Sequence, residues 1–361
     1  MQKIIGLLLL SNLFFAGVAY ADEVDDLVRA EMELQKIPGL SIAVVRDGKI
    51  IKEAGYGLAN LEHNVPARPE TIYQTGSVGK QFTAALVMLL VEDGKIVLDD
   101  PVSKYLPNTP EAWQKITIRH LLTHTSGLGD PYAKISLIKN YTDDELITIE
   151  SKIPLKFTPG SKWDYSNTGY HVLGFVCNKV GGKFYGYQIV ERIFKPCGMT
   201  TARMINERDI IANRSAGYEM NNGEPKNQTW VSPTLNSTAD GSIYLTVRDL
   251  AQWDAALLDN KLFKPSTREG MWSPVKLSDG TTYPYGFGWF LAPVNGHKCL
   301  SHGGAWQGFT TYITRYIDDH LTVIVLTNRA GANPGLIAQI IAGHYVPELT
   351  PQAVKHASKK K

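Results

Sequence analysis

The feature that most constrains the fold is a pair of β-rich hairpin patterns at opposite ends of the chain. Near the start, apolar residues alternate over 40–55 around Asp47-Gly48, a dipeptide typical of type I′ hairpin turns. Near the end, two β-rich runs over 309–326 flank Asp318-Asp319, and the aromatic run 285–291 also has a strand-like pattern. The simplest architecture that uses these runs is one antiparallel sheet built from both chain ends.

The middle of the chain has mostly helical patterns, which many proline and glycine residues interrupt. Residues 82–91 are apolar almost all round, which is typical of a helix buried inside a domain. Thr246 and Asp249 form a capping box before an apolar stripe of helical spacing. Two further helices, at 24–35 and 334–342, are expected to cover the sheet.

We therefore predict an α+β fold with one catalytic domain over residues 22–346. The sheet lobe takes about 22–75 and 280–346, the helical lobe takes about 76–279, and a cleft between them is the expected site. Residues 347–361 form a basic tail that we expect to be disordered.

The first 21 residues have the pattern of a signal peptide. Lys3 precedes an apolar stretch over 4–16, and Ala19-Tyr20-Ala21 fits the small-x-small rule for cleavage after Ala21. We expect an exported protein, periplasmic or secreted, that starts at Asp22, although an uncleaved anchor is the alternative. No second long apolar segment follows, so we expect no stable membrane span after processing.

The charge balance and the cysteines exclude several classes of protein. With 37 basic and 35 acidic residues, the net charge of +2 gives no drive toward nucleic acid. Cys177, Cys197 and Cys299 are an odd number, so one thiol at least stays free, while pairing of Cys177 with Cys197 remains open. His120 and His124 lie four residues apart without a glutamate motif between them. We expect neither a metal nor a cofactor.

The first candidate motif is Ser77-Val78-Gly79-Lys80, which opens the buried helix. At a helix N-terminus the dipole and free N–H groups stabilise developing negative charge on Ser77. Lys80 follows one turn later on the same face, where a lysine in an apolar cleft can act as a base. Gly76 and Gly79 are too close together for a phosphate-binding loop, and Thr75 excludes a Gly-x-Ser-x-Gly elbow.

The second motif is Tyr165-Ser166-Asn167, which precedes a helix predicted from Thr168. A phenol beside a lysine ammonium can shuttle protons, and Asn167 offers both a donor and an acceptor.

The third motif is His302-Gly303-Gly304-Ala305, just before a strand predicted from Trp306. Gly303 and Gly304 let the backbone approach a ligand closely. The Ala305 N–H could then form an oxyanion hole with the Ser77 N–H, and Trp306 is a candidate cleft-lining residue.

In this order, the three motifs resemble those of class C β-lactamases and the related DD-peptidases, penicillin-binding proteins, D-aminopeptidases and esterases. The stretches 120–128 and 237–241 are similar to segments of the same family. The resemblance implies a nucleophile at Ser77, an activating partner at Lys80, a general base and acid at Tyr165, and a substrate-amide ligand at Asn167. Whether Lys80 or Tyr165 is the first base stays open.

His302 departs from the class C β-lactamase pattern, which has Lys-Thr-Gly at the third motif. A neutral histidine would hold a β-lactam carboxylate less firmly than an ammonium does. The resemblance therefore implies an exported acyl-enzyme hydrolase of D-Ala-D-Ala-type peptides or small esters, with weak β-lactam activity and peptidoglycan as a possible partner. The alternatives are a true class C-like β-lactamase and a penicillin or peptidoglycan sensor that acylates without turnover. The oligomeric state stays open.

Overall fold

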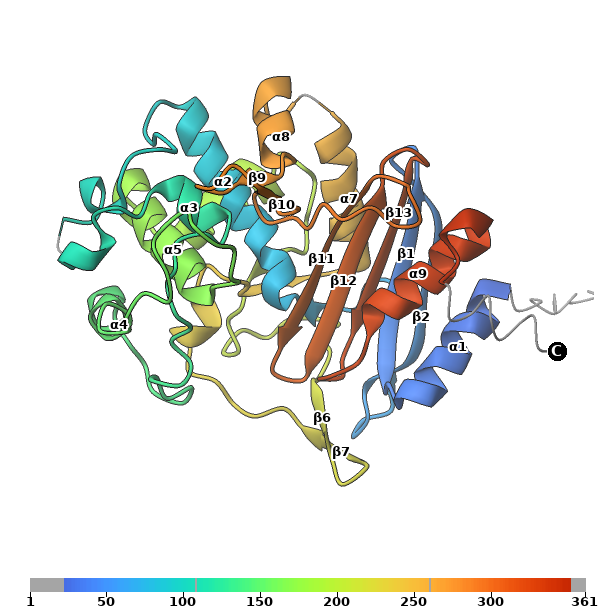
Figure 1. Cartoon of the computed structure of the whole chain (residues 1–361). Coiled ribbons are helices and arrows are strands. Elements are labelled where there is room, and N and C mark those ends of the chain that lie inside the picture. The colour runs from blue at the N-terminus through green and yellow to red at the C-terminus, as the bar shows by residue number, and fades with distance from the viewer. Residues whose placement is uncertain (1–22, 108, 260, 352–361) are drawn as a thin grey trace, which may run out of the picture.

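Both chain ends contribute to one antiparallel sheet in the computed structural model, which describes residues 23–107, 109–259 and 261–351 (Figure 1). The strand order is β11-β12-β13-β1-β2-β3, and β1 pairs antiparallel with β13, so the predicted α+β sheet is confirmed. The strands are β1 (Gly39–Arg46), β2 (Lys49–Asn60), β3 (Val65–Pro66), β11 (Cys299–Trp306), β12 (Phe309–Tyr316) and β13 (Leu321–Thr327).

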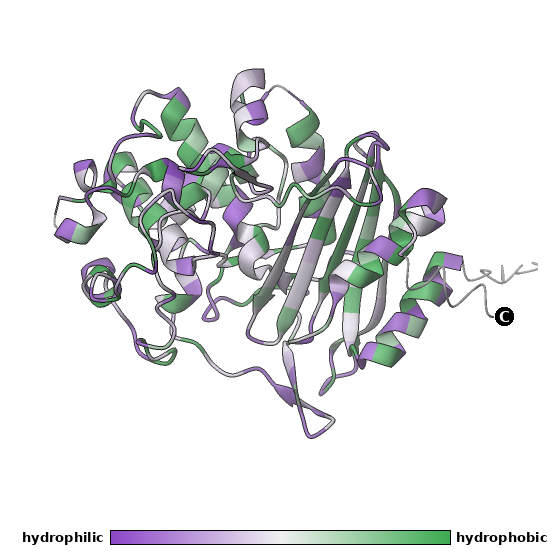
Figure 2. Ribbon diagram, in the orientation of Figure 1, coloured by the Kyte–Doolittle hydropathy of each residue, from purple (hydrophilic) through white to green (hydrophobic). Residues whose placement is uncertain are grey.

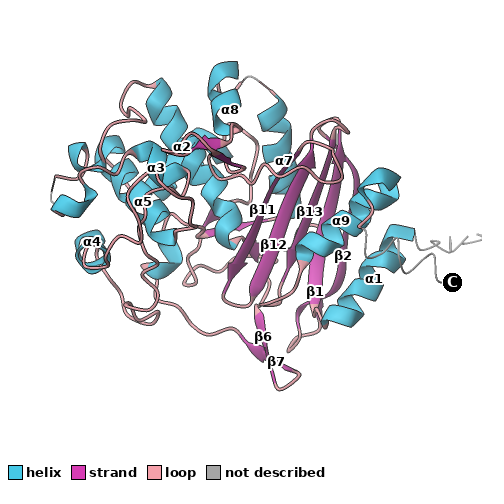
Figure 3. Cartoon of the chain, in the orientation of Figure 1, coloured by secondary structure: helices cyan, strands magenta, loops and turns pink. Residues whose placement is uncertain are grey.

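The central strand β1 is buried on both faces because helices cover both sides of the sheet. Ile42 and Val44 pack in one apolar cluster with α1 (Glu23–Gln35) and α9 (Pro334–Tyr345). Ala43 and Val45, which alternate with them, belong to the main core on the other face. Figure 2 shows hydrophobic residues through the central strands, and Figure 3 shows α1 and α9 side by side against the sheet.

The predicted boundary between the lobes is wrong for α7 (Val247–Leu258). This helix falls inside 76–279, yet it packs on the sheet because its buried face joins the cluster of Ala43 and Val45. Thr246 and Asp249 form the predicted capping box at its start. An amphipathic pattern indicates that one face is buried but not which element covers it.

The buried helix α2 (Lys80–Glu92) is confirmed, and the short 3₁₀ helix η1 (Gly76–Gly79) precedes it. The other α-helices are α3 (Ile118–Leu122), α4 (Asp143–Glu150), α5 (Asn167–Gly181), α6 (Tyr185–Ile189) and α8 (Pro265–Met271). Short 3₁₀ or π segments are η2 (Val102–Lys104), η3 (Glu111–Trp113), η4 (Val190–Phe194), η5 (Leu235–Ser237) and η6 (Pro347–Leu349). Small strands are β4 (Tyr73–Gln74), β5 (Arg203–Met204), β6 (Tyr218–Asn221), β7 (Glu224–Asn227), β8 (Ile243–Leu245), β9 (Val275–Lys276) and β10 (Thr282–Tyr283).

The run 285–291 is not the strand that its aromatic content predicted. It makes only single bridges, between Tyr285 and Phe290 and between Phe290 and Ser301. Gly288 has a φ of +76°, which bends the chain, and Tyr285 is fully buried. Here aromatic residues mark burial around a turn and not a strand.

Residues 347–351, the first part of the predicted disordered tail, are described by the structure, and 347–349 belong to the fold. Residues 347–349 form η6, and Leu349 is fully buried against the α9 cluster, because an apolar side chain there completes the packing. Residues 352–361 and the predicted signal peptide lie outside the described residues.

The three cysteines are unpaired, with Cys177 and Cys299 buried. Within the described ranges, no helix is both long and apolar enough to cross a bilayer.

Candidate active site

Ser77 lies in η1, where the chain enters the buried helix α2. The preceding Gly76 has a φ of +52°, and a Cβ on it would lie 2.6 Å from the Ala305 nitrogen. Glycine is therefore required at position 76 both for the left-handed backbone and for the close approach of β11. Ser77 consequently sits at the contact between η1 and the sheet, as the sequence predicted.

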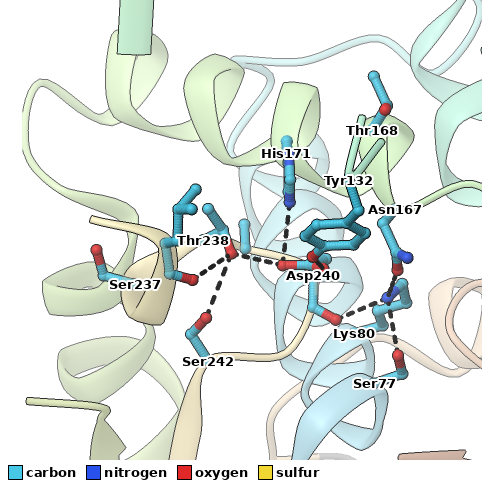
Figure 4. Close-up of polar contacts among 12 residues, drawn as sticks. Ser77, Lys80, Tyr132, Asn167, Thr168, His171, Ser237, Thr238, Asp240 and Ser242 are labelled. Carbon is cyan, nitrogen blue, oxygen red and sulfur yellow. Dashed lines mark hydrogen bonds and ion pairs between the residues drawn. The ribbon is translucent and has the colours of Figure 1, made fainter. Parts of the chain in front are cut away.

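Lys80 is fully buried and joins three segments of the chain (Figure 4). Its Nζ lies 3.1 Å from Ser77 Oγ, 2.8 Å from Asn167 Oδ1 and 2.7 Å from the Asp240 carbonyl oxygen. An ammonium can donate to all three acceptors. A neutral amine would keep two of these bonds and accept the Ser77 hydroxyl proton with its lone pair. The predicted pair of Ser77 and Lys80 thus has the geometry of nucleophile and base.

Asn167 is the first residue of α5, which Ser166 caps by accepting the Gly169 N–H. The side-chain carbonyl of Asn167 accepts from Lys80, and its amide donates to Asp130 Oδ2 at 2.9 Å. The structure therefore places Asn167 beside Lys80, with its amide orientation set by these two partners, and its role as a substrate-amide ligand stays a prediction.

Tyr165, two residues before Asn167, also lies near Lys80. Its ring centroid is 5.0 Å from Lys80 Nζ, and the ring lines a hollow together with Ser77 and Gly304. The hydroxyl is buried and has no hydrogen-bond partner among the described residues. A phenol whose hydroxyl is not held by another group keeps its proton available for transfer to a neighbouring atom.

The third motif forms part of strand β11, whereas the sequence placed it before a strand. A Cβ on Gly304 would lie 1.9 Å from the Thr75 carbonyl oxygen and 3.0 Å from the Ser77 nitrogen. Thr311 Oγ1 donates to the same Thr75 oxygen at 2.6 Å and ties η1 to β12. Gly304 therefore lets β11 lie against η1, so that the Ala305 and Ser77 backbones meet.

We expect Gly304→Ala to lower kcat strongly, because the added methyl group must push β11 away from η1 and separate the two oxyanion-hole amides. Loss of one such donor typically costs on the order of 10²- to 10³-fold in kcat. Gly303→Ala is the matched control, because its Cβ would lie no closer than 3.3 Å to the Tyr312 ring and 3.7 Å from the Thr311 carbonyl oxygen. Steady-state kinetics on a common ester substrate compares the two, and equal losses would contradict this role of Gly304.

His302 is buried, and both of its ring nitrogens are engaged inside the protein. Its Nδ1 lies 2.6 Å from the Gly303 carbonyl oxygen, and its Nε2 lies 3.1 Å from the Tyr285 hydroxyl. That hydroxyl is also 3.1 Å from His124 Nε2, and His124 Nδ1 accepts the Ser166 N–H at 3.1 Å. With both rings neutral, all hydrogen bonds are satisfied if His124 carries its hydrogen on Nε2 and His302 on Nδ1.

Burial and the nearby charge of Lys80 keep these rings neutral. They lower the pKa of His302 to about 3, and they hold the pKa of His124 well below its usual range. A direct bond from the His302 ring to a substrate carboxylate would have to replace one of its present contacts. Position 302 therefore does not supply the positive charge that a Lys-Thr-Gly motif supplies.

Two hollows meet at Ser77 and Ala305. One is also lined by Tyr132, Asp240 and Trp306, and the other by Tyr165, Phe290, His302 and Tyr312. Trp306 lies in the first, where its Nε1 donates to Asn236 Oδ1 at 2.7 Å. All nine residues predicted for the site are thus gathered around one cleft, which has room for a group on each side of Ser77.

Sequence reasoning missed several residues of the site. Asp240 lies in the stretch 237–241, which was singled out only for its family resemblance, and Tyr132 lies in a loop without any pattern. His171 follows Asn167 at the spacing of one helical turn, a signal that could have been noticed.

Within the described residues, no three His, Cys, Asp or Glu side chains are grouped so as to hold a metal ion.

The sequence of the chain matches the family model for beta-lactamase over residues 24–344. The chain belongs to the beta-lactamase family. It is 32% identical to penicillin-binding protein 4* of Bacillus subtilis, over 80% of this chain and 68% of that protein. It is 28% identical to a D-aminopeptidase of Gluconobacter oxydans, over 87% of this chain but only 61% of that protein.

Solved structures of this family share the fold. An octameric penicillin-binding protein homologue from Pyrococcus abyssi has a TM-score of 0.79 at 30% identity, covering 90% of this chain and 77% of that one. A D-stereospecific amidohydrolase from Streptomyces has a TM-score of 0.72 at 26% identity, covering 87% and 97%. The chain is therefore a serine hydrolase of the β-lactamase and penicillin-binding type, with the α+β fold that the sequence predicted.

Proposed function

We propose that the protein is an exported hydrolase that cleaves D-Ala-D-Ala-type peptides or small esters through an acyl-enzyme on Ser77, with weak β-lactam activity. The observation that carries this proposal is the contact between Lys80 Nζ and Ser77 Oγ, at 3.1 Å, beside the meeting point of the Ser77 and Ala305 backbones. A nucleophile, a base and two oxyanion donors are thereby available at one place.

In the proposed reaction, neutral Lys80 takes the Ser77 proton while Ser77 Oγ attacks the substrate carbonyl carbon. The Ser77 and Ala305 N–H groups stabilise the oxyanion. When the tetrahedral intermediate collapses, the Tyr165 hydroxyl gives its proton to the leaving atom. The proton held by the Lys80 ammonium then returns to Tyr165 through a water molecule, because the two groups make no direct hydrogen bond. Water then attacks the ester, returns Ser77 and releases the acid, with the same groups carrying protons in reverse.

Lys80 is assigned as the first base because of the contacts around each candidate. It is within hydrogen-bond reach of Ser77 Oγ, whereas the Tyr165 hydroxyl has no partner among the described residues. Proton transfer requires hydrogen-bond reach first and a suitable proton affinity second. Tyr165 is therefore assigned to the leaving group, which is not yet present in the free enzyme.

The substrate class is inferred from the site and from relatives. Two relatives are described as a D-aminopeptidase and a D-stereospecific amidohydrolase, so amides of D-amino acids are reasonable candidates. A penicillin carboxylate would find a neutral His302 at the third motif, since burial and Lys80 lower the pKa of that residue to about 3. This supports a preference for substrates that need no cationic anchor there.

The test is a substrate panel of nitrocefin, a p-nitrophenyl ester and a D-Ala-D-Ala peptide, with burst kinetics on each. We expect turnover of the ester or the peptide, and a nitrocefin kcat/KM below about 10⁴ M⁻¹s⁻¹, the lower end of typical enzyme efficiency. Efficient nitrocefin hydrolysis would favour a true class C-like β-lactamase. One equivalent of product followed by silence on every substrate would instead identify a sensor.

Export is part of the proposal and rests on Lys3, the apolar stretch 4–16 and Ala19-Tyr20-Ala21. We expect N-terminal sequencing of protein from the periplasm or medium to begin at Asp22. Replacing Ala21 with a bulky residue should block cleavage, because the processing site requires small side chains. Recovery of the full chain from Met1 in the cytoplasm would contradict the proposed localisation.

A further inference from the structure

A cluster of charged side chains lies next to Lys80 and is joined to it through Asp240 (Figure 4). His171 on α5 is fully buried between two carboxylates, with Nδ1 2.6 Å from Glu150 Oε1 and Nε2 3.3 Å from Asp240 Oδ1. The other oxygen of Asp240 accepts the Tyr132 hydroxyl at 2.8 Å. The Asp240 backbone carbonyl accepts from Lys80 at 2.7 Å. Asp240 therefore connects the cluster both to the base and to the wall of the cleft.

The segment that carries Asp240 also packs against the backbone of the nucleophile. A Cβ on Gly241 would lie 2.3 Å from the Gly76 carbonyl oxygen and 2.9 Å from the Ser77 nitrogen. Thr75 Oγ1 donates to the Gly241 carbonyl at 3.1 Å, and Thr238 Oγ1 donates to Asp240 Oδ1 at 2.7 Å. A shift of this segment would therefore move the Lys80 acceptor and one side of the oxyanion hole together.

The charges in the cluster support one another. Burial alone would lower the pKa of His171, but the charges of Asp240 and Glu150 outweigh it and raise this pKa to about 10. Burial would raise the pKa of Asp240, yet His171 and Lys80 hold it well below its usual range. Burial raises the pKa of Glu150, and His171 opposes that rise. His171 is thus an imidazolium at neutral pH.

The other ionisable groups that act on this cluster come from several elements. The centroid of the Tyr132 ring lies 6.2 Å from that of the His171 ring. Tyr185 interacts electrostatically with Asp240, and Asp130 interacts electrostatically with Glu150. Burial raises the pKa of Tyr132 and of Tyr185 well above the usual range, so both phenols are neutral. Asp143 also lines the hollow beside His171, from the first turn of α4.

We propose that His171, clamped between Glu150 and Asp240, is a positioning residue that holds the Asp240 segment against Lys80 and tunes the base through the charge of Asp240. This inference rests on the proposed function, since it requires proton transfer from Ser77. Buried ion pairs contribute little net stability, because desolvation offsets their attraction. Asp240, a member of the cluster, contacts Lys80 directly through its backbone carbonyl, so the cluster can serve the base rather than stability.

The variants His171→Gln and Asp240→Asn should move the pH dependence in opposite directions. The readout is the rate constant for labelling of Ser77 by a fluorophosphonate probe, which falls at low pH because the base must lose its proton. His171→Gln removes a positive charge, which favours protonation of the base and moves the acidic limb to higher pH. Asp240→Asn removes a negative charge and keeps the backbone carbonyl, so it moves the limb to lower pH. The His171→Gln variant should also be labelled more slowly than the wild type, by roughly ten- to a hundredfold, because its base is misplaced.

His297→Gln is the matched control, because His297 also contacts a carboxylate, Asp319, at 2.9 Å, at a place outside the site. It should leave both the rate and the limb unchanged. Loss of rate in His171→Gln and Asp240→Asn without opposite shifts of the limb would overturn the proposal, since a purely structural cluster behaves in that way. Unchanged profiles in both variants would overturn it too.

A measurement on the wild-type enzyme covers the case in which the variants do not fold. In protein labelled with ¹⁵N-histidine, one imidazolium signal should persist at pH 8, above the ordinary range of histidine titration. The absence of such a signal would overturn the proposal. A different result separates the two proposals. If no probe labels Ser77 while the imidazolium signal is present, the proposed catalytic function is contradicted, but the charged state of His171 between its two carboxylates is not.

Discussion

Ser77→Ala should abolish covalent labelling by a phosphonate or penicillin probe and remove nearly all turnover. Lys80 Nζ contacts Ser77 Oγ at 3.1 Å, and its other two partners, Asn167 and the Asp240 carbonyl, are not nucleophiles. Removing the nucleophile of a serine protease costs on the order of 10⁶-fold in kcat. Intact-mass analysis should show one adduct on the wild type and none on Ser77→Ala, while thermal unfolding stays close to that of the wild type.

Ser126→Ala is the matched control for this prediction. Ser126 lies in the family-like stretch 120–128, and it is buried, with Oγ accepting the Leu128 N–H at 3.3 Å. Because its hydroxyl is buried and its Oγ accepts a backbone N–H, Ser126 should not react, so its alanine variant should keep the adduct. An adduct that persists in Ser77→Ala, or disappears in Ser126→Ala, would place the nucleophile elsewhere.

The candidate catalytic residues could be predicted from the sequence because each belongs to a short motif whose chemistry depends on local geometry. Ser77 and Lys80 share a helix face whatever surrounds the helix, and Gly303 and Gly304 permit close backbone approach in any fold. The shared sheet was predictable for a similar reason, since two hairpin patterns with polar turns point to adjacent strands. Local rules were sufficient for these features.

The remaining parts of the site depend on contacts between distant segments. Glu150 on α4, His171 on α5 and Asp240 in the turn before β8 give no signal until the fold brings them together. The bonds that join His124, Tyr285 and His302 are equally long-range, and burial decides their charge state. Aromatic enrichment over 285–291 was mistaken for a strand because those rings are buried beside the cleft by a glycine-rich turn.

Tyr165→Phe should lower kcat on the best substrate by on the order of a hundred- to ten-thousandfold, or about 2.7 to 5.4 kcal/mol in the barrier. The hydroxyl makes no hydrogen bond among the described residues, so its removal leaves no buried partner unsatisfied and should hardly change stability. The ring remains 5.0 Å from Lys80 Nζ in the variant, so the ammonium keeps its contact with the aromatic face. A loss of rate therefore reports the proton that the phenol transfers.

Tyr170→Phe separates this effect from the general loss of a tyrosine near the lysine. The Tyr170 ring is 5.3 Å from Lys80 Nζ, but its hydroxyl donates to the Leu122 carbonyl at 3.0 Å inside the core. That variant should lose about 1 kcal/mol of stability and retain most of its activity, the reverse of Tyr165→Phe.

Because esters with good leaving groups need less protonation, the Tyr165→Phe defect should be smaller on a p-nitrophenyl ester than on a peptide. An unchanged kcat on the peptide would remove Tyr165 from the mechanism and leave Lys80 as the only proton carrier beside Ser77.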